Sequence, residues 1–174
     1  MVISKSFVHG NAFITERGGG SSVSSPGPLD NVQDGGIVNW SDVIGYPQGW
    51  GKTYRGKENQ RVWFHVAIST PSMMSGSRIQ LDKIYIFCNT TEGCFITDVD
   101  VWDSKYPVGT FRDLAITGDH SEGEFENQTV FRPRISNDQL HTMIFGLGIS
   151  VRVTFTTRSN VTFHSAGADF LVSN

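Results

Sequence analysis

The sequence has no long apolar run, no cluster of basic residues and only two cysteines. Nowhere do about 18 apolar residues follow one another, so no membrane-spanning helix is expected. The 14 Lys and Arg residues are scattered and are outnumbered by 17 Asp and Glu, which gives a formal net charge of −3. Since no basic stretch could follow a phosphate backbone, neither nucleic acid nor a membrane is an expected partner.

The amino-terminal stretch also lacks the apolar segment of a secretory signal. Met1 to Gly10 contains one Lys and no apolar run of the required length. We therefore expect a cytoplasmic location, in which Cys88 and Cys94 remain reduced. The alternative is a disulfide, because the turn-like run between the two cysteines could bring their β-carbons together across a hairpin.

Short motifs of familiar enzyme classes are missing as well. The sequence contains no Gly-X-Ser-X-Gly, His-Glu-X-X-His or Cys-X-X-Cys motif, so classical hydrolase chemistry and transition-metal sites are not indicated. Gly51-Lys52-Thr53 resembles the end of a phosphate loop. That motif would need a Gly where Tyr46 stands, with a strand before the loop and a helix after it, so we reject it.

What the sequence does have is a high content of apolar residues in alternating patterns. Apolar residues make up 38% of the chain and include 12 Phe, which is enough for a packed core. The clearest alternation runs from Thr142 to Thr156, where apolar residues occupy every odd position: Met143, Phe145, Leu147, Ile149, Val151, Val153 and Phe155. A period of two predicts a long strand, and we expect it in the middle of one sheet.

Further strands are predicted by similar patterns. Residues 60–70 alternate, with Val62, Phe64, Val66 and Ile68 on one face and Trp63 and His65 on the other. A phase slip predicts a bulge near Asp82-Lys83. The remaining predicted strands are Ser6 to Glu16 with a break at Gly10-Asn11, Arg78 to Cys88, Cys94 to Trp102 with Thr97, Val99 and Val101 on one face, Val161 to Val172, and shorter ones at Gly36 to Trp40, Val108 to Ile116 and Asn127 to Arg132.

These patterns define the expected fold class. About eight strands joined by frequent turns predict an all-β, two-layer antiparallel β-sandwich, with a jelly-roll-like arrangement as one variant. At this length we expect a single domain over residues 1–174. Residues 17–36 are rich in Gly and Ser and should form a flexible loop.

Aromatic residues are concentrated between Gly49 and His65, and this region is the leading candidate for a binding site. Trp50, Tyr54, Trp63 and His65 could hold a small ligand, either a carbohydrate or an aromatic metabolite, by stacking and hydrogen bonding. The leading functional hypothesis is therefore a non-catalytic small-ligand-binding protein. A structural role for a Trp and a His on one strand is the competing interpretation.

Two other function classes remain open. The first is a cofactor-independent cyclase or isomerase, in which His65, Asp119, His120 or His164 would act as acid and base within an apolar cavity. The second is a structural or self-associating protein, for which an edge strand rich in Phe would matter. The sequence does not determine the oligomeric state.

Three carboxylates near the end of one predicted strand raise the question of a metal ion. Asp98 and Asp100 share a face, and Asp103 follows, so a calcium site is conceivable. The spacing lacks the twelve-residue loop and glycine of an EF-hand. A solvated polar face is the favoured interpretation, and no cofactor is expected.

Four stretches carry a resemblance to a known family. They are Trp63 to Ile68, Gly118 to Ser121, Gly146 to Val151 and Thr162 to Phe170. Together they resemble a family of small bacterial and fungal all-β proteins that is catalogued as a domain of unknown function. The likeness runs from about Gly49-Trp50-Gly51 to Phe170. It implies a free-standing protein and supplies no catalytic residue.

Overall fold

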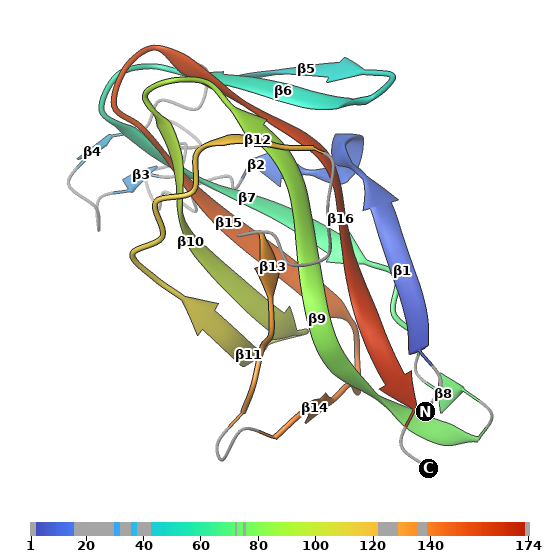
Figure 1. Ribbon diagram of the computed structural model, residues 1–174. Coiled ribbons are helices and arrows are strands. Elements are labelled where there is room, and N and C mark those ends of the chain that lie inside the picture. The colour runs from blue at the N-terminus through green and yellow to red at the C-terminus, as the bar shows by residue number, and fades with distance from the viewer. Residues whose placement is uncertain are drawn as a thin grey trace, which may run out of the picture.

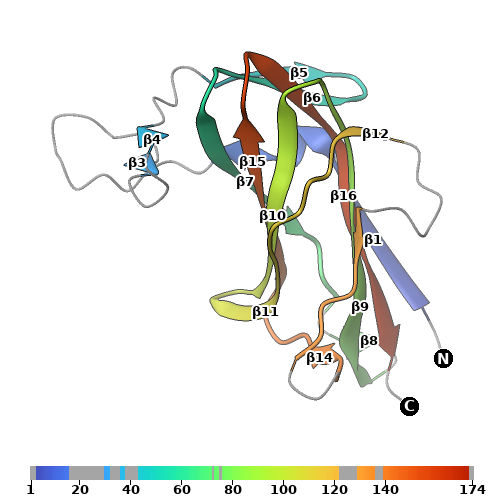
Figure 2. The same ribbon diagram turned by 60° about the vertical axis from the view of Figure 1, so that its left-hand side comes forward.

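Two antiparallel sheets face each other across an apolar core in the computed structural model (Figures 1 and 2). The structure describes residues 3–15, 30–31, 36–37, 43–71, 73–74, 76–121, 129–135 and 139–172. Most of the predicted loop at 17–36, and residues 38–40 of the predicted strand at 36–40, lie outside these ranges. Among the described residues no helix is long and apolar enough to cross a membrane.

The smaller sheet has five strands in the order β11-β10-β15-β7-β2. Its strands are β2 (Ile14–Thr15), β7 (Gln60–Ile68), β10 (Cys94–Asp103), β11 (Tyr106–Phe111) and β15 (Leu147–Phe155). The central position of β15 confirms that the long alternating segment near the carboxyl end runs through the middle of a sheet.

The larger sheet has nine strands and follows the path β12-β9-β16-β6-β5, with four further strands paired to it. The strands on the path are β12 (Gly118–His120), β9 (Ser77–Thr90), β16 (Ser159–Val172), β6 (Gly51–Gly56) and β5 (Ile44–Gln48). The others are β1 (Ile3–His9), which pairs with β16, and β8 (Met73–Met74), β13 (Val130–Phe131) and β14 (His141–Thr142), which pair with β9.

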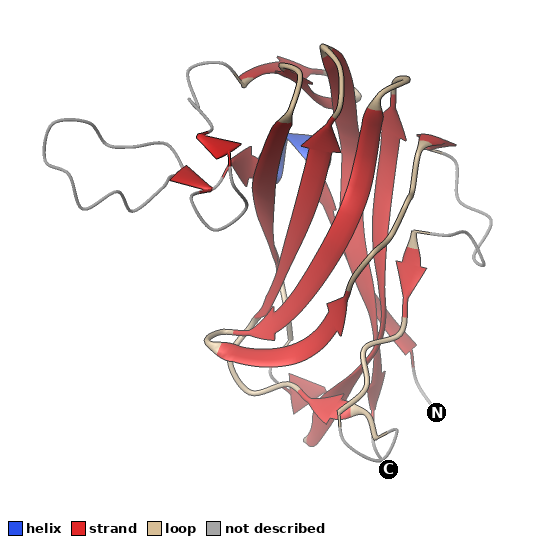
Figure 3. Cartoon of the chain, turned by 90° about the vertical axis from the view of Figure 1, so that its left-hand side faces the viewer, coloured by secondary structure: helices blue, strands red, loops and turns tan. Residues whose placement is uncertain are grey.

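The remaining described elements are short. Strands β3 (Asp30–Asn31) and β4 (Gly36–Ile37) pair with each other, and η1 (Gly10–Ala12) is a 3₁₀ turn. Every strand pairing is antiparallel, and Figure 3 shows the long strands running side by side with loops at their ends. The predicted all-β, two-layer antiparallel sandwich is therefore confirmed, with several strands of two or three residues in addition to the main ones.

The alternating residues of β7 and β15 build the core from the five-stranded sheet. The odd residues of β15 from Leu147 to Phe155 are buried, as are the even residues of β7 from Val62 to Ile68. Across the interface, β9 and β16 contribute Ile84, Ile86, Ala166, Ala168 and Phe170. A period of two leaves the intervening side chains on the outer faces, which fixes where a surface site can lie.

Gly10 divides the first predicted strand between the two sheets. Strand β1 pairs with β16, whereas β2 pairs with β7 of the opposite sheet. The chain crosses at Gly10, where a side-chain Cβ would lie 1.8 Å from the carbonyl oxygen of Phe163. Only a glycine fits this close approach. The predicted break at Gly10-Asn11 is confirmed.

Register shifts confirm one predicted bulge and reveal three that the pattern did not predict, one of which inserts Val108 into β11. Asp169 pairs with Lys83 and Phe170 with Leu81, so Asp82 is the extra residue in β9. A second bulge inserts His164 into β16. A third, at Thr97 of β10, corrects the predicted faces, because Ile96 is buried together with Val99 and Val101 while Thr97 is not.

One part of the long alternating segment does not form a strand. Strand β14 ends at Thr142 and β15 begins at Leu147, and Phe145, predicted to be buried, is 62% exposed. The cause is Asp103, whose carboxylate accepts hydrogen bonds from the backbone N–H groups of Ile144, Phe145 and Gly146. These bonds favour a turn over continued sheet.

The two cysteines are free and lie in the core. Burial raises the pKa of both thiols to about 12, and for Cys88 the nearby Asp119 acts in the same direction. The predicted reduced state agrees with this structure.

Candidate functional site

Nine residues in cross-strand register on the outer face of the five-stranded sheet, together with Arg112, form the candidate site, here called the five-strand face. Three come from β7, three from β15 and three from β10, and Arg112 follows β11. They are Trp63, His65, Ala67, Gly148, Ser150, Arg152, Asp98, Asp100, Trp102 and Arg112. The alternation of β7 and β15, whose other residues enter the core, places these groups outside.

Trp63 lies beside two guanidinium groups. The Cζ atom of Arg152, its cross-strand partner, is 5.5 Å from the centroid of the Trp63 ring, and that of Arg112 is 5.9 Å away. Both distances allow cation–π attraction. The indole is therefore held in place by its charged neighbours.

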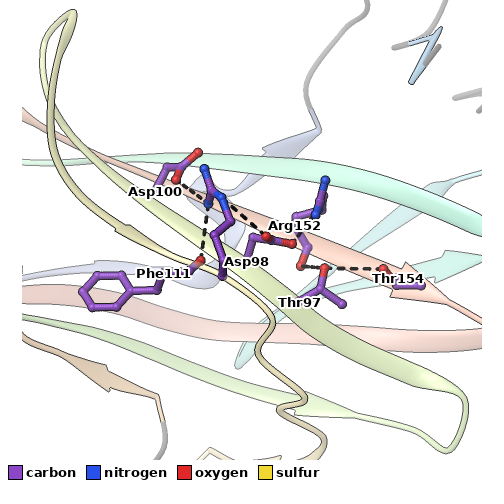
Figure 4. Close-up of polar contacts among 7 residues, drawn as sticks. Thr97, Asp98, Asp100, Phe111, Arg152 and Thr154 are labelled. Carbon is purple, nitrogen blue, oxygen red and sulfur yellow. Dashed lines mark hydrogen bonds and ion pairs between the residues drawn. The ribbon is translucent and has the colours of Figure 1, made fainter. Parts of the chain in front are cut away.

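The two arginines form ion pairs with two carboxylates, and Figure 4 labels Arg152, Asp98 and Asp100. Arg152 Nε donates to Asp98 Oδ2 over 2.6 Å, and Arg112 Nη1 forms an ion pair with Asp100 Oδ1 over 2.6 Å. Arg112 Nε also lies 3.6 Å from Asp98 Oδ1. The ion pair with Asp100 raises the pKa of Arg112 above its ordinary value. Only 1% of Asp98 is exposed, so the two arginines, which are partly exposed, share a buried carboxylate.

These contacts bear on the predicted calcium ligands. Asp98 and Asp100 already neutralise arginines, and the carboxylate of Asp103 accepts a hydrogen bond from His141 Nε2 over 2.9 Å in addition to three backbone N–H groups. Burial raises the pKa of Asp103, but these four hydrogen bonds outweigh it and hold that pKa below its ordinary value. Carboxylates with such partners offer few oxygens to a cation.

His65 and Ser150 form the middle of the five-strand face. His65 Nδ1 and Ser150 Oγ share a hydrogen bond of 2.8 Å, and Ser150 is the cross-strand neighbour of Asp100. The imidazole and the hydroxyl thus lie next to the cross-strand row of Trp63, Arg152 and Asp98, and they hydrogen-bond to each other.

An open hollow with a volume of about 370 Å³ continues the face beyond Ala67 and Gly148. Its lining includes Ser104 and Phe145. Phe145 stacks at 18° on Tyr106, with the ring centroids 6.0 Å apart, and both rings are exposed. The side chain of Ala67 is small and Gly148 has none, which leaves space for the hollow at this end of the face.

Two of the four predicted ligand contacts lie elsewhere. Tyr54 is only 2% exposed and packs on Phe64 in the core, where its hydroxyl donates to the carbonyl of Phe13, so the prediction that it contacts a ligand is wrong. Trp50 is 56% exposed, but it belongs to the turn between β5 and β6 of the larger sheet. Trp63 and His65 are the two that the structure brings together.

The predicted acid and base residues are split between the sheets. His65 lies on the five-strand face, whereas Asp119 and His120 lie on β12 and His164 on β16. The latter three are neighbours: hydrogen bonds from Ser121 lower the pKa of Asp119, and the nearby His164 and His120 act in the same direction. His164 Nδ1 lies 3.1 Å from the carbonyl oxygen of Trp50. A single site that combines them with His65 is therefore not formed.

Sequence reasoning missed the residues that complete the face. Arg152 and Ser150 occupy the polar positions of the strongest alternating segment, so their outward orientation was predictable. Their position beside Trp63 and His65 depends on the pairing of β7 with β15, which no local pattern indicates. Arg112 lies outside any strand, and nothing in the sequence indicated it.

Comparisons with known proteins give a family and distant structural likenesses. A model described as "Family of unknown function (DUF6623)" matches residues 48–150, which confirms the resemblance to a family of unknown function. No curated protein matches the sequence. Among solved structures, a family 29 carbohydrate-binding module from Piromyces equi aligns with 97% of this chain and 91% of its own, at 10% identity and a TM-score of 0.41.

Proposed function

The chain belongs to this family of unknown function, DUF6623, and we propose that it is a non-catalytic carbohydrate-binding protein whose ligand lies on the five-strand face. The observation that carries the proposal is the row formed by Trp63, Arg152 and Asp98, with Arg112 beside it. The row combines an aromatic ring with charged hydrogen-bonding groups whose positions are fixed before a ligand arrives.

Fixed polar groups favour a ligand that carries many hydroxyl groups. Arg112 is partly exposed, so its remaining N–H groups can donate to ligand oxygens. Charge-assisted hydrogen bonds are stronger than neutral ones. Because the ion pairs already hold the arginines, binding would cost little side-chain entropy.

The open shape of the site favours a carbohydrate over an aromatic metabolite. Sites for apolar small molecules are enclosed and bury most of the ligand. Here the groups lie on a sheet surface, and the hollow beside Ala67 and Gly148 extends that surface to the exposed rings of Tyr106 and Phe145. An extended sugar chain could stack on rings at both ends of such a face.

Calorimetric titration with soluble gluco-, manno-, galacto- and xylo-oligosaccharides tests the proposal. We expect binding to at least one of them, and Trp63→Ala should weaken it by about tenfold or more, as is common for a central aromatic contact. Trp63→Phe keeps a ring at this position and should retain part of the affinity.

Trp50→Ala is the matched control, since it removes an exposed Trp from the opposite sheet. It should leave the affinity of this site within about twofold. Equal affinity of the Trp63→Ala protein and the unmodified protein at every binding event would refute the proposal, provided that circular dichroism shows both folded.

A further inference from the structure

A second group of aromatic and charged side chains lies on the outer face of the nine-stranded sheet. Its members, here called the aromatic cluster, are Lys5 and Phe7 of β1, Tyr85 and Phe87 of β9, and Asp169 of β16. Phe7, Gly167 and Tyr85 form one cross-strand row, and Lys5, Asp169 and Lys83 form the next. Since Ala168 and Phe170 enter the core, the residue between them, Asp169, faces outward.

Phe7 offers an exposed ring at the centre of this cluster. It is 45% exposed, and its centroid lies 5.7 Å from that of Tyr85 and 6.1 Å from that of Phe87. A Cβ at position 167 would lie 2.1 Å from Phe7 Cδ1, so the ring lies directly over the backbone of Gly167. One side of the ring is supported and the cluster remains accessible.

Asp169 beside this ring has an acceptor that the described residues do not use. Its side chain is 5% exposed, and Oδ2 accepts hydrogen bonds from Tyr85 Oη over 2.7 Å and from Lys5 Nζ over 3.2 Å. Asp169 Oδ1 is buried and has no hydrogen-bond partner among the described residues. A buried carboxylate oxygen without a donor is costly, so the site calls for an N–H or O–H group from outside the described residues.

Charge decides which donor fits. Lys5 already neutralises Asp169, and an incoming cation would be repelled by the Lys5 ammonium. A hydroxyl group donates without adding charge. Burial and the hydrogen bond to Asp169 both raise the pKa of Tyr85, so its hydroxyl stays protonated and directed at Oδ2, which leaves Oδ1 for the ligand. The Lys5 side chain, which contacts Oδ2 and not Oδ1, is 45% exposed.

We infer that the aromatic cluster is a second carbohydrate site, which binds one sugar ring by stacking on Phe7 and by a hydroxyl that donates to Asp169 Oδ1. This site is independent of the five-strand face and faces the opposite side of the sandwich. The protein would therefore hold two sugars at once, pointing in opposite directions.

Calorimetry with the same four oligosaccharide series tests the inference through the stoichiometry. The unmodified protein should bind two ligands, and Phe7→Ala should reduce this to one while the remaining affinity changes by less than about twofold. Phe7→Tyr keeps the ring and should still bind two. Trp50→Ala serves as the matched control and should also bind two.

The outcomes separate the two sites. If Phe7→Ala loses one binding event and Trp63→Ala loses the other, both sites are supported. A single event that Trp63→Ala removes and Phe7→Ala leaves unchanged overturns the second site alone, and an ordered water is then the donor to Asp169. A single event that only Phe7→Ala removes supports the second site and overturns the function proposed for the five-strand face. If none of the four oligosaccharide series gives a heat of binding, both proposed sites are overturned.

Discussion

On the five-stranded sheet two carboxylates are matched with two arginines, whereas on the nine-stranded sheet Asp169 lies among aromatic rings with an oxygen left over. In the first arrangement each carboxylate forms an ion pair with a guanidinium group, and Asp100 Oδ1, which makes no hydrogen bond, lies 2.6 Å from Arg112 Nη1. In the second, Asp169 forms an ion pair with Lys5 through Oδ2, and Oδ1 has no hydrogen-bond partner among the described residues. The comparison shows that similar carboxylates on the two outer faces of one sandwich differ in role according to what their cross-strand neighbours supply.

The largest expected effect concerns the network of the five-strand face. Asp98→Ala leaves Arg152 without its carboxylate and Arg112 with only one, and both guanidinium groups are partly buried. Removing one partner of a largely buried ion pair should lower the free energy of unfolding by about 3 kcal/mol. Urea unfolding followed by circular dichroism measures it. A loss below about 1 kcal/mol would show that water already screens this network.

A smaller effect is expected at Asp103. This residue ends β10, and its carboxylate binds the turn before β15. Asp103→Asn keeps one acceptor but loses the charge and leaves backbone N–H groups without partners, so it should cost about 2 kcal/mol at neutral pH. The pKa of Asp103 is lowered on folding, so its contribution is present above the ordinary aspartate pKa and is lost as the pH falls through the lowered value. The variant should therefore lose less stability on acidification than the unmodified protein. Unfolding curves between neutral pH and the acid limit measure this difference, and parallel curves would contradict it.

The smallest expected effect tests whether the two faces are independent. Trp63 and Phe7 lie on the outer sides of two sheets that stack about 10 Å apart. The unfolding free energies lost in Trp63→Ala and Phe7→Ala should therefore add in the double variant to within about 0.5 kcal/mol. A larger coupling, measured by the same urea unfolding, would mean that the core transmits strain between the faces.

Local patterns predicted those parts of the fold in which one side of a strand is buried. The segments that became β7 and β15 were identified correctly, and the phase slip at Asp82-Lys83 corresponds to a bulge. Phe145 departs from this pattern. It continues the same alternation, yet a carboxylate 42 residues earlier in the sequence, that of Asp103, binds its backbone N–H and holds it in a turn.

The candidate site was predictable to a similar extent. Trp63 and His65 could be assigned to one outer face because they alternate with core residues. Tyr54 is predicted to be exposed but is buried, whereas Phe145 is predicted to be buried but is exposed. The position of Tyr54 among aromatic residues suggests a ligand contact, but its ring packs on Phe64 in the core. Which face of a short strand is buried depends on the sheet that covers it.

By itself the sequence determined that this protein is an all-β sandwich with Trp63 and His65 on an outer face. These properties follow from a period of two, which each strand carries in its own residues. Only the tertiary structure decided that Arg152 and Asp98 join Trp63, that His164 lies on the other sheet, and that Asp169 accepts a hydrogen bond from Tyr85, whose ring packs on Phe7. Such contacts depend on strand pairing and register between residues far apart in the chain, and pairing is selected by the fit of the whole core.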